Sequence, residues 1–274
     1  MGVGYTTIMY ESLLDGVAEI SASQYDGVET SLSEISAVGT DAFREQLGDY
    51  DLDLYCVMGS WLESETVADR IVSGTETVAD LGTPYLGILP PHRGTTDDED
   101  LERWLGQICD AASDAGITPV LHHHGGTRIE RPDEIETWLD RTPDNLGLLW
   151  DSAHHYPYGE HYPDGDVTDG IERFADDIEY VHLKDIAPSD GFEDHIEALS
   201  NGQRHLDTVF LYYDSFTDLG DGVIDFHSLY EALEAAGYDS HITIEIENRT
   251  EHTLVHAKEN LDYWRAVTGD MQST

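Results

Sequence analysis

Short apolar runs alternate with longer amphipathic segments along most of the chain. The run 146–150 is continuously apolar and has the length of one buried strand. The segment 67–81, in contrast, repeats apolar residues at helical spacing. The pattern predicts eight strands, within residues 4–10, 25–30, 52–58, 84–89, 117–124, 146–151, 178–185 and 241–247.

Helices are predicted between these strands, and several of them have recognisable ends. Acidic residues begin the segment 98–115, and Gly116 ends it. Pro132 begins the next helix, and Gly237 ends a later one. The predicted helices cover residues 13–20, 42–47, 67–81, 98–115, a segment beginning at 132, 171–176, 228–236 and 253–267.

Regular alternation of strands and helices favours a parallel sheet. Eight such units predict an α/β protein with a closed (β/α)₈ TIM barrel, as a single domain over residues 1–274. An open, doubly wound sheet is the competing fold, but no GxGxxG loop follows the first strand. The segment 188–226 is predicted to be a long irregular insertion, which suits a lid or a contact in a homo-oligomer.

The net charge of the chain limits the kinds of partner that it can bind. The chain has 57 acidic residues against 13 Lys and Arg, so its net charge is 13 − 57 = −44. Nucleic acid binding requires a basic surface, so we expect no nucleic acid partner. The acids are spread along the whole chain, which is typical of a hydrated surface adapted to high salt. We therefore expect a halophilic protein.

Two further features bear on location. The first residues lack a basic segment followed by an apolar core, and no run approaches the ~20 apolar residues of a membrane span. The two cysteines, Cys56 and Cys109, are scattered in apolar stretches and are expected to be reduced and buried. These features predict a cytoplasmic protein without a membrane partner.

Four predicted strands end in side chains that bind metals or transfer protons. Asp151 ends an apolar strand, where a cation would offset the cost of burying its carboxylate. Because the active sites of parallel barrels lie at the C-terminal ends of the strands, these groups are expected to meet. The residues are His122, His124, Asp151, His154, His182, Lys184, Glu245 and Glu247. Carboxylates and imidazoles favour Mn²⁺, Co²⁺, Mg²⁺ or Zn²⁺ over a thiolate site.

The alternation of side chains assigns faces to several of these groups. His182 and Lys184 share one face of their strand, as do Glu245 and Glu247. A lysine beside a metal ligand suits a hydroxylated or oxyanionic substrate, because its ammonium stabilises a developing enolate. His154 could be a ligand or a proton-transfer group. His155 is expected to support substrate binding.

The motifs Asp151-Ser-Ala-His154, His182-Leu-Lys184-Asp185 and Ile244-Glu-Ile-Glu247 resemble those of the xylose isomerase-like TIM-barrel superfamily. This superfamily includes sugar epimerases, endonuclease IV and inosose dehydratases. The resemblance implies Asp151, His182 and Glu245 as metal ligands. It also implies substrate or proton-transfer roles for His154 and Lys184, with Glu245 as a further catalytic group.

One position departs from the family pattern. Many members carry a Glu on the fifth strand, where this chain has His122. Either Glu130 folds back to supply the missing metal ligand, or His122 binds the metal itself. If Glu130 supplies that ligand, His122 is expected to bind substrate. His124, His155 and Glu247 are expected to bind substrate in either case. Glu130 could equally be only the acid that precedes the next helix.

Within the superfamily, the segments 122–127, 148–151 and 220–226 are most similar to inosose dehydratases. The resemblance implies a metal-dependent dehydratase of a keto-polyol such as 2-keto-myo-inositol, with Mn²⁺ or Co²⁺ as the preferred cofactor. A ketose 3-epimerase or sugar isomerase that uses the same site, with Glu130 and Glu245 as its carboxylate pair, is the alternative. The net charge speaks against a DNA-repair endonuclease, and a non-catalytic sugar-binding barrel is the remaining possibility.

Overall fold

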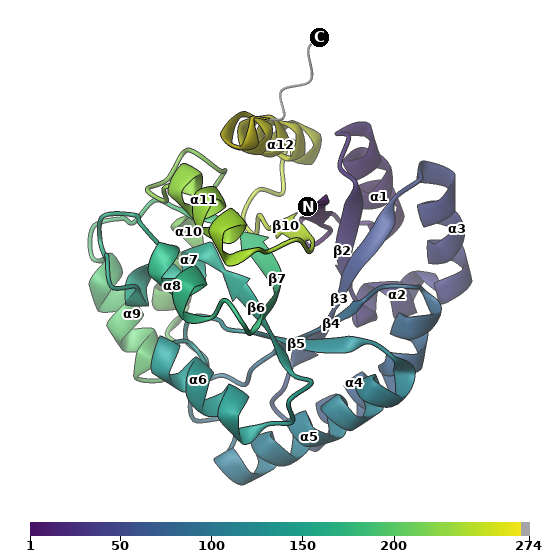
Figure 1. Ribbon diagram of the computed structural model, residues 1–274, viewed down its shortest axis with the longest axis horizontal. Helices are drawn as coiled ribbons and strands as arrows, with labels where there is room; N and C mark the ends of the chain where they lie inside the picture. Colours follow the sequence, from purple (N-terminus) through teal and green to yellow (C-terminus); the bar gives the residue numbers. More distant parts are fainter. Residues whose placement is uncertain (270–274) are drawn as a thin grey trace.

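The computed structural model describes residues 1–269, and its centre is a closed barrel of eight parallel strands (Figure 1). The strands follow the order β1-β10-β7-β6-β5-β4-β3-β2 around the barrel, so β1 pairs with both β2 and β10. Their bounds are β1 Val3–Thr6, β2 Gly27–Ser31, β3 Asp53–Trp61, β4 Tyr85–Leu89, β5 Thr118–His122, β6 Gly147–Asp151, β7 Ile178–Leu183 and β10 Ile242–Ile244.

Helices surround the barrel and cover the outer faces of its strands (Figure 1). Serine or aspartate side chains cap several of them: Asp97, for example, accepts a hydrogen bond from the backbone N–H of Asp100. The helices are α1 Leu13–Ala22, α2 Leu32–Val38, α3 Thr40–Tyr50, α4 Glu65–Asp80, α5 Asp98–Ala115, α6 Pro132–Arg141, α7 Ser152–His155, α8 Thr168–Arg173, α9 Phe192–Ser200, α10 Leu206–Asp214, α11 Phe226–Ala236 and α12 Thr253–Thr268, with a short 3₁₀ turn, η1, at Tyr156–Tyr158.

The barrel predicted from the sequence is confirmed, and each predicted strand range overlaps one barrel strand. The segment 188–226 differs from the prediction. It is not irregular throughout, because it contains α9, α10 and the short strand β9 (Phe216–Thr217), which pairs antiparallel with β8 (Asp185–Ile186) just before the segment. The buried residues Phe192, Ile196 and Leu199 give α9 an apolar face that the sequence analysis did not identify.

Apolar and aromatic side chains fill the N-terminal half of the barrel interior. They form one cluster in which Tyr180 packs against Tyr85 with a ring separation of 5.3 Å. The phenol groups are satisfied inside the fold, since Tyr180 hydrogen-bonds Thr243 and Tyr85 contacts Ser240 at 2.7 Å. This packed floor leaves the C-terminal end of the barrel for polar side chains.

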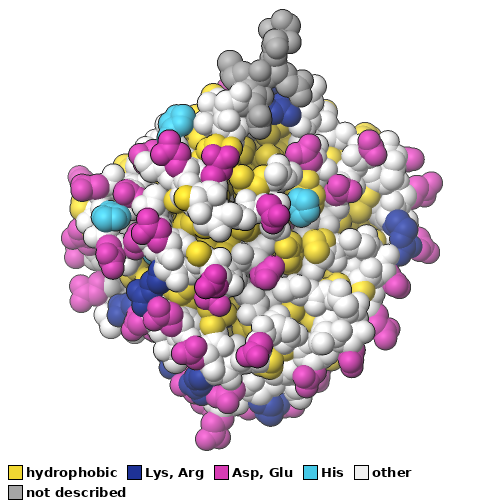
Figure 2. All heavy atoms as spheres, in the orientation of Figure 1, with side chains coloured by type: hydrophobic (Ala, Val, Ile, Leu, Met, Phe, Trp, Pro, Cys, Tyr) yellow, Lys and Arg dark blue, Asp and Glu magenta, His cyan; other side chains and the backbone are white. Residues whose placement is uncertain are grey.

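Acidic side chains are scattered over the surface with few basic ones between them, as Figure 2 shows for one face. Cys56 and Cys109 are both buried and free. In the described part of the chain, no helix combines the length and the apolar character that crossing a membrane requires.

Candidate metal centre

The period-two alternation of the strands explains how the polar side chains meet. On β6, Leu149 belongs to the apolar floor and Asp151 points inward two residues later. On β7, Tyr180 belongs to the floor, and His182 follows at the next inward position. Asp151 and His182 are register partners in the β6–β7 pair, so they lie at the same level of the barrel.

Four buried side chains from four strands or strand ends form a group whose possible ligand atoms lie within 4.8 Å of one another: His122, Asp151, His182 and Glu245. Among the described residues, neither ring nitrogen of His122 has a hydrogen-bond partner, and its Nε2 lies 3.6 Å from Oδ2 of Asp151. Buried polar atoms without partners are costly, and a cation between them would supply the missing contacts. Two imidazoles and two carboxylates fit a divalent metal such as Mn²⁺, Co²⁺ or Zn²⁺.

The ring of His182 is held from both sides. Its Nε2 lies 2.7 Å from Oε2 of Glu29 on β2, and its Nδ1 lies 3.1 Å from Oε2 of Glu245. Burial alone lowers the pKa of His182, but the charges of Glu29 and Glu245 outweigh it and raise the pKa to about 10. The contact with Glu29 turns Nδ1 toward Asp151 and Glu245, which is the arrangement of a metal-binding histidine with a supporting carboxylate.

Lys184 places an ammonium group beside these residues. Its Nζ lies 2.6 Å from Oε2 of Glu245, 2.9 Å from Oε2 of Glu247 and 3.3 Å from Oδ2 of Asp151. It also lies 4.8 Å from the ring centre of Phe216. Burial lowers the pKa of Lys184, but the three carboxylates raise it well above its usual value, so the buried group stays charged.

His154 is fixed between Lys184 and the inserted helix α10. Its Nδ1 lies 2.6 Å from the hydroxyl of Tyr212, and its Nε2 lies 3.3 Å from Nζ of Lys184. Because an ammonium only donates, Nε2 is the acceptor in its contact with Lys184. Burial, together with the charges of His124 and Lys184, holds the pKa of His154 well below its usual value. Gly125 makes room for this contact, since a Cβ there would lie 2.2 Å from the Tyr212 hydroxyl.

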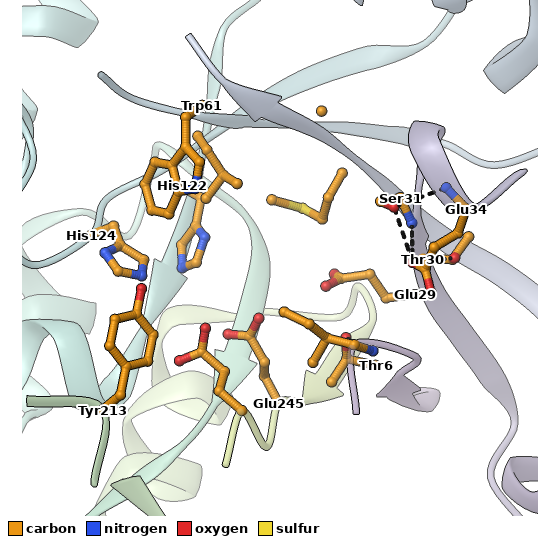
Figure 3. Close-up of a pocket in the computed structure, with 15 residues that line it drawn as sticks. Thr6, Glu29, Thr30, Ser31, Glu34, Trp61, His122, His124, Tyr213 and Glu245 are labelled. Carbon is orange, nitrogen blue, oxygen red and sulfur yellow. Dashed lines mark hydrogen bonds between the residues drawn. The ribbon is translucent and has the colours of Figure 1, made fainter. Parts of the chain in front are cut away.

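Of the ligand group, His122 and Glu245 line a cavity of about 510 Å³ at the barrel mouth. Trp61 and two histidines lie on one side of it, and a hydrogen-bonded group around Glu34 lies on the other (Figure 3). The Glu34 carboxylate accepts hydrogen bonds from the hydroxyls of Thr7 and Thr30. Among the described residues that line the cavity there is no Lys or Arg. Its polar and aromatic lining includes Thr6, Glu29, Thr30, Ser31, Glu34, Trp61, His122, His124, Tyr213, Glu245 and Glu247.

Glu130, expected as a metal ligand, lies outside the ligand group. Its Oε1 accepts hydrogen bonds from Nε and Nη2 of Arg93 at 3.0 and 2.6 Å, and its Oε2 accepts one from the backbone N–H of Gly126. These partners neutralise and satisfy the carboxylate. His122 stands in its place, so the geometry supports the other alternative for the fifth strand.

His155, expected to bind substrate, also lies away from the cavity. Its Nε2 faces Oδ2 of Asp169 on α8 at 3.2 Å, and its ring packs 5.6 Å from that of Trp150. The side chain is buried behind β6, where it joins the barrel to α8. His124 and Glu247, the other expected substrate contacts, do line the cavity with His122.

Two residues that shape the site were not predicted from the sequence, Glu29 and Tyr212. Glu29 is a buried acid one residue before the end of the predicted strand 25–30, so a search for acids near strand ends would have identified it. Tyr212 gave no such signal, because it reaches His154 from a segment that was expected to be irregular.

Comparison with known proteins places these observations in context. A sequence model of the family described as xylose isomerase-like TIM barrel matches residues 17–267. The chain is 32% identical over 184 residues to an inosose dehydratase of Lacticaseibacillus casei, with 62% of this chain and 56% of that protein covered. It is 35% identical over 147 residues to the inosose dehydratase of Geobacillus thermodenitrificans strain NG80-2, with 52% and 45% covered. The chain thus spans about half the length of the curated relatives that it matches.

Solved structures show the same fold at low sequence identity. A crystal structure of the IOLI protein with a bound zinc atom covers 100% of both chains with a TM-score of 0.75 and 15% identity. A D-tagatose 3-epimerase-like protein matches with a TM-score of 0.75 and 19% identity, over 98% of this chain and 99% of that one. At these identities the likeness concerns the fold alone.

Proposed function

The chain belongs to the xylose isomerase-like TIM barrel family, and from this premise we propose that it is a divalent-metal-dependent dehydratase of a keto-polyol such as 2-keto-myo-inositol. The observation that carries the proposal is the buried group of two imidazoles and two carboxylates, in which His122 has no other partner among the described residues. Similarity to inosose dehydratases supports this choice of reaction.

In this proposal His122, Asp151, His182 and Glu245 hold the metal. A metal held there, with Mn²⁺ or Co²⁺ preferred, would polarise the ketone of the substrate and so acidify the neighbouring C–H bond. The cavity offers many hydroxyl and carboxylate groups and no Lys or Arg among its described lining residues. Such a lining suits a neutral, hydroxyl-rich substrate better than a phosphorylated one.

The chain's own residues would move the protons. Glu247 lines the cavity and would take the proton from the carbon next to the ketone, while the Lys184 ammonium stabilises the negative charge that develops on oxygen. The C–O bond at the next carbon then breaks. The leaving hydroxyl would depart as water with the proton that Glu247 took from carbon, while His154, whose Nε2 lies 3.3 Å from Nζ, would hold the Lys184 ammonium in place.

The alternative, a ketose 3-epimerase, has weaker support. It requires two bases on opposite faces of one carbon, and Glu130 was the expected partner of Glu245. Because Arg93 binds Glu130 outside the cavity, the structure does not bring this pair together.

Product analysis tests the proposed reaction. Purified protein with Mn²⁺ is incubated with 2-keto-myo-inositol, and the mixture is followed by ultraviolet absorbance and mass spectrometry. Dehydration produces an absorbing enone and the loss of one water, whereas epimerisation conserves mass. An epimer without any loss of water would establish the alternative and reject the dehydratase. Asp151→Asn, which keeps the side-chain shape but removes a ligand charge, is the inactive control.

A further inference from the structure

A second group of possible ligands lies next to the first. Ligand atoms of His124, His154 and Glu247 also lie within 4.8 Å of one another. Two of these residues follow members of the first group by two positions, since His124 follows His122 and Glu247 follows Glu245. In an extended chain, side chains two positions apart point to the same side. His124 and Glu247 therefore lie on the same side as His122 and Glu245, closer to the mouth of the barrel.

The ammonium of Lys184 lies between the two groups. From the first group it contacts Oε2 of Glu245 at 2.6 Å, and from the second it contacts Oε2 of Glu247 at 2.9 Å and Nε2 of His154 at 3.3 Å. Lys184 is fully buried and cannot exchange these partners for water in this conformation. Its positive charge therefore lies where a second cation would contact His154 and Glu247.

We propose that His124, His154 and Glu247 form a second divalent-cation subsite, and that the Lys184 ammonium fills it in this chain. The centre would then contain two cations, one metal ion and one ammonium. Two imidazoles and a carboxylate suit Co²⁺, Zn²⁺ or Mn²⁺ better than Ca²⁺, which prefers oxygen ligands. The inference rests on the metal centre of the proposed function but not on the reaction.

Charge balance supports an ammonium in this position. The three carboxylates that contact Nζ, those of Asp151, Glu245 and Glu247, together carry three negative charges. One dication and one ammonium balance them, so burial of the whole group leaves no net charge among these partners. Without the ammonium, the carboxylates and the vacated space would favour a second dication.

Metal stoichiometry tests the inference without any substrate. Metal-free wild type, Lys184→Ala and the double variant Lys184→Ala/His124→Ala are dialysed against excess Co²⁺, and the bound metal per chain is measured by elemental analysis. We expect one ion in the wild type, two in Lys184→Ala, and one again in the double variant, which lacks a ligand of the second subsite.

Electron paramagnetic resonance gives a second readout with Mn²⁺. Lys184→Ala should show a spin-coupled pair, and the wild type should show an isolated ion. Lys184→Ser opens the same space with a polar side chain and replaces Lys184→Ala if that variant does not fold. A single ion in the opened variants at saturating metal would overturn the second subsite, and two ions in the wild type would show that the ammonium does not fill it. A wild type without bound metal would instead reject the metal centre itself, and with it this inference.

Discussion

At the residue scale, the orientation of one histidine depends on a carboxylate from the far side of the barrel. Glu29 and His182 are 153 positions apart in the sequence, yet both are buried and their side chains meet at 2.7 Å. A supporting carboxylate of this kind fixes the ring and increases its basicity as a ligand. Glu29 should therefore contribute to metal affinity although it does not belong to the ligand group.

Glu29→Gln should weaken metal binding by roughly ten- to hundredfold, the usual scale for such outer partners. The dissociation constant for Mn²⁺ or Co²⁺ is measured by competition with a chelator. Glu34→Gln is the matched control, because Glu34 lines the same cavity but hydrogen-bonds hydroxyl groups and not a ligand. Equal losses in both variants would point to a general effect of charge and contradict a specific role for Glu29.

Lys184→Met separates the ammonium from the metal ligands. Met keeps most of the stem, so it still fills the buried space, and metal content should stay near that of the wild type. Loss of the charge should lower kcat/KM by roughly a hundredfold or more, the scale for one preorganised group that stabilises transition-state charge. Lower stability with unchanged kcat/KM would assign Lys184 to an internal ion pair alone.

The structure brings some of the predicted site residues together and keeps others apart, for a physical reason. Asp151, His182 and Glu245 follow apolar strands, and alternation within a parallel barrel is enough to bring them together. Glu130 and His155 lie apart from this group because each pairs with a residue from another element, Arg93 and Asp169 respectively. Local patterns predict which way a strand residue points, but they do not predict which distant side chain will neutralise a charge.

At the scale of elements, helix α10 completes the site from the segment between β8 and β9. Its Tyr212 is fully buried, packs against Phe216 with rings 5.0 Å apart and hydrogen-bonds His154. The barrel pattern gave the eight strands, whereas this segment has no counterpart in the repeating strand–helix unit. The helices α9 and α10 could not be located from the regular alternation of strands and helices alone.

Gly125→Ala should disturb the packing of helix α10 against the barrel. The added Cβ would lie 2.2 Å from the Tyr212 hydroxyl, so Tyr212 must move and its hydrogen bond to His154 is lost. We expect a loss of about 1–3 kcal/mol in the free energy of unfolding, measured by denaturant titration, together with reduced kcat. Gly106→Ala on α5 is the control, because a Cβ there meets nothing within 4 Å and should be neutral or stabilising. Similar stability of both variants would contradict the proposed packing.

At the scale of the whole molecule, charge dominates the surface. The acids exceed Lys and Arg by 57 − 13 = 44, and Figure 2 shows them spread over the visible face and not gathered in one patch. Even the basic residues are engaged: Arg141, for example, contacts both Asp98 and Glu102. Such a surface repels itself and disfavours nucleic acid.

Salt should therefore stabilise the protein. Screening lengths fall from about 30 Å at 0.01 M to about 3 Å at 1 M salt, so repulsion between surface acids weakens as KCl is added. We predict that the thermal unfolding midpoint rises between millimolar and molar KCl. An unchanged midpoint would reject adaptation to high salt and leave the net charge without this explanation.

We propose that turnover depends on one metal ion in the group of His122, Asp151, His182 and Glu245. The most direct measurement is a titration of metal-free protein with Mn²⁺ or Co²⁺, in which enone formation from 2-keto-myo-inositol and bound metal are followed together. We predict no turnover after EDTA treatment, a linear rise to one equivalent and a plateau beyond it. Full turnover by protein that elemental analysis shows to be metal-free would contradict the claim.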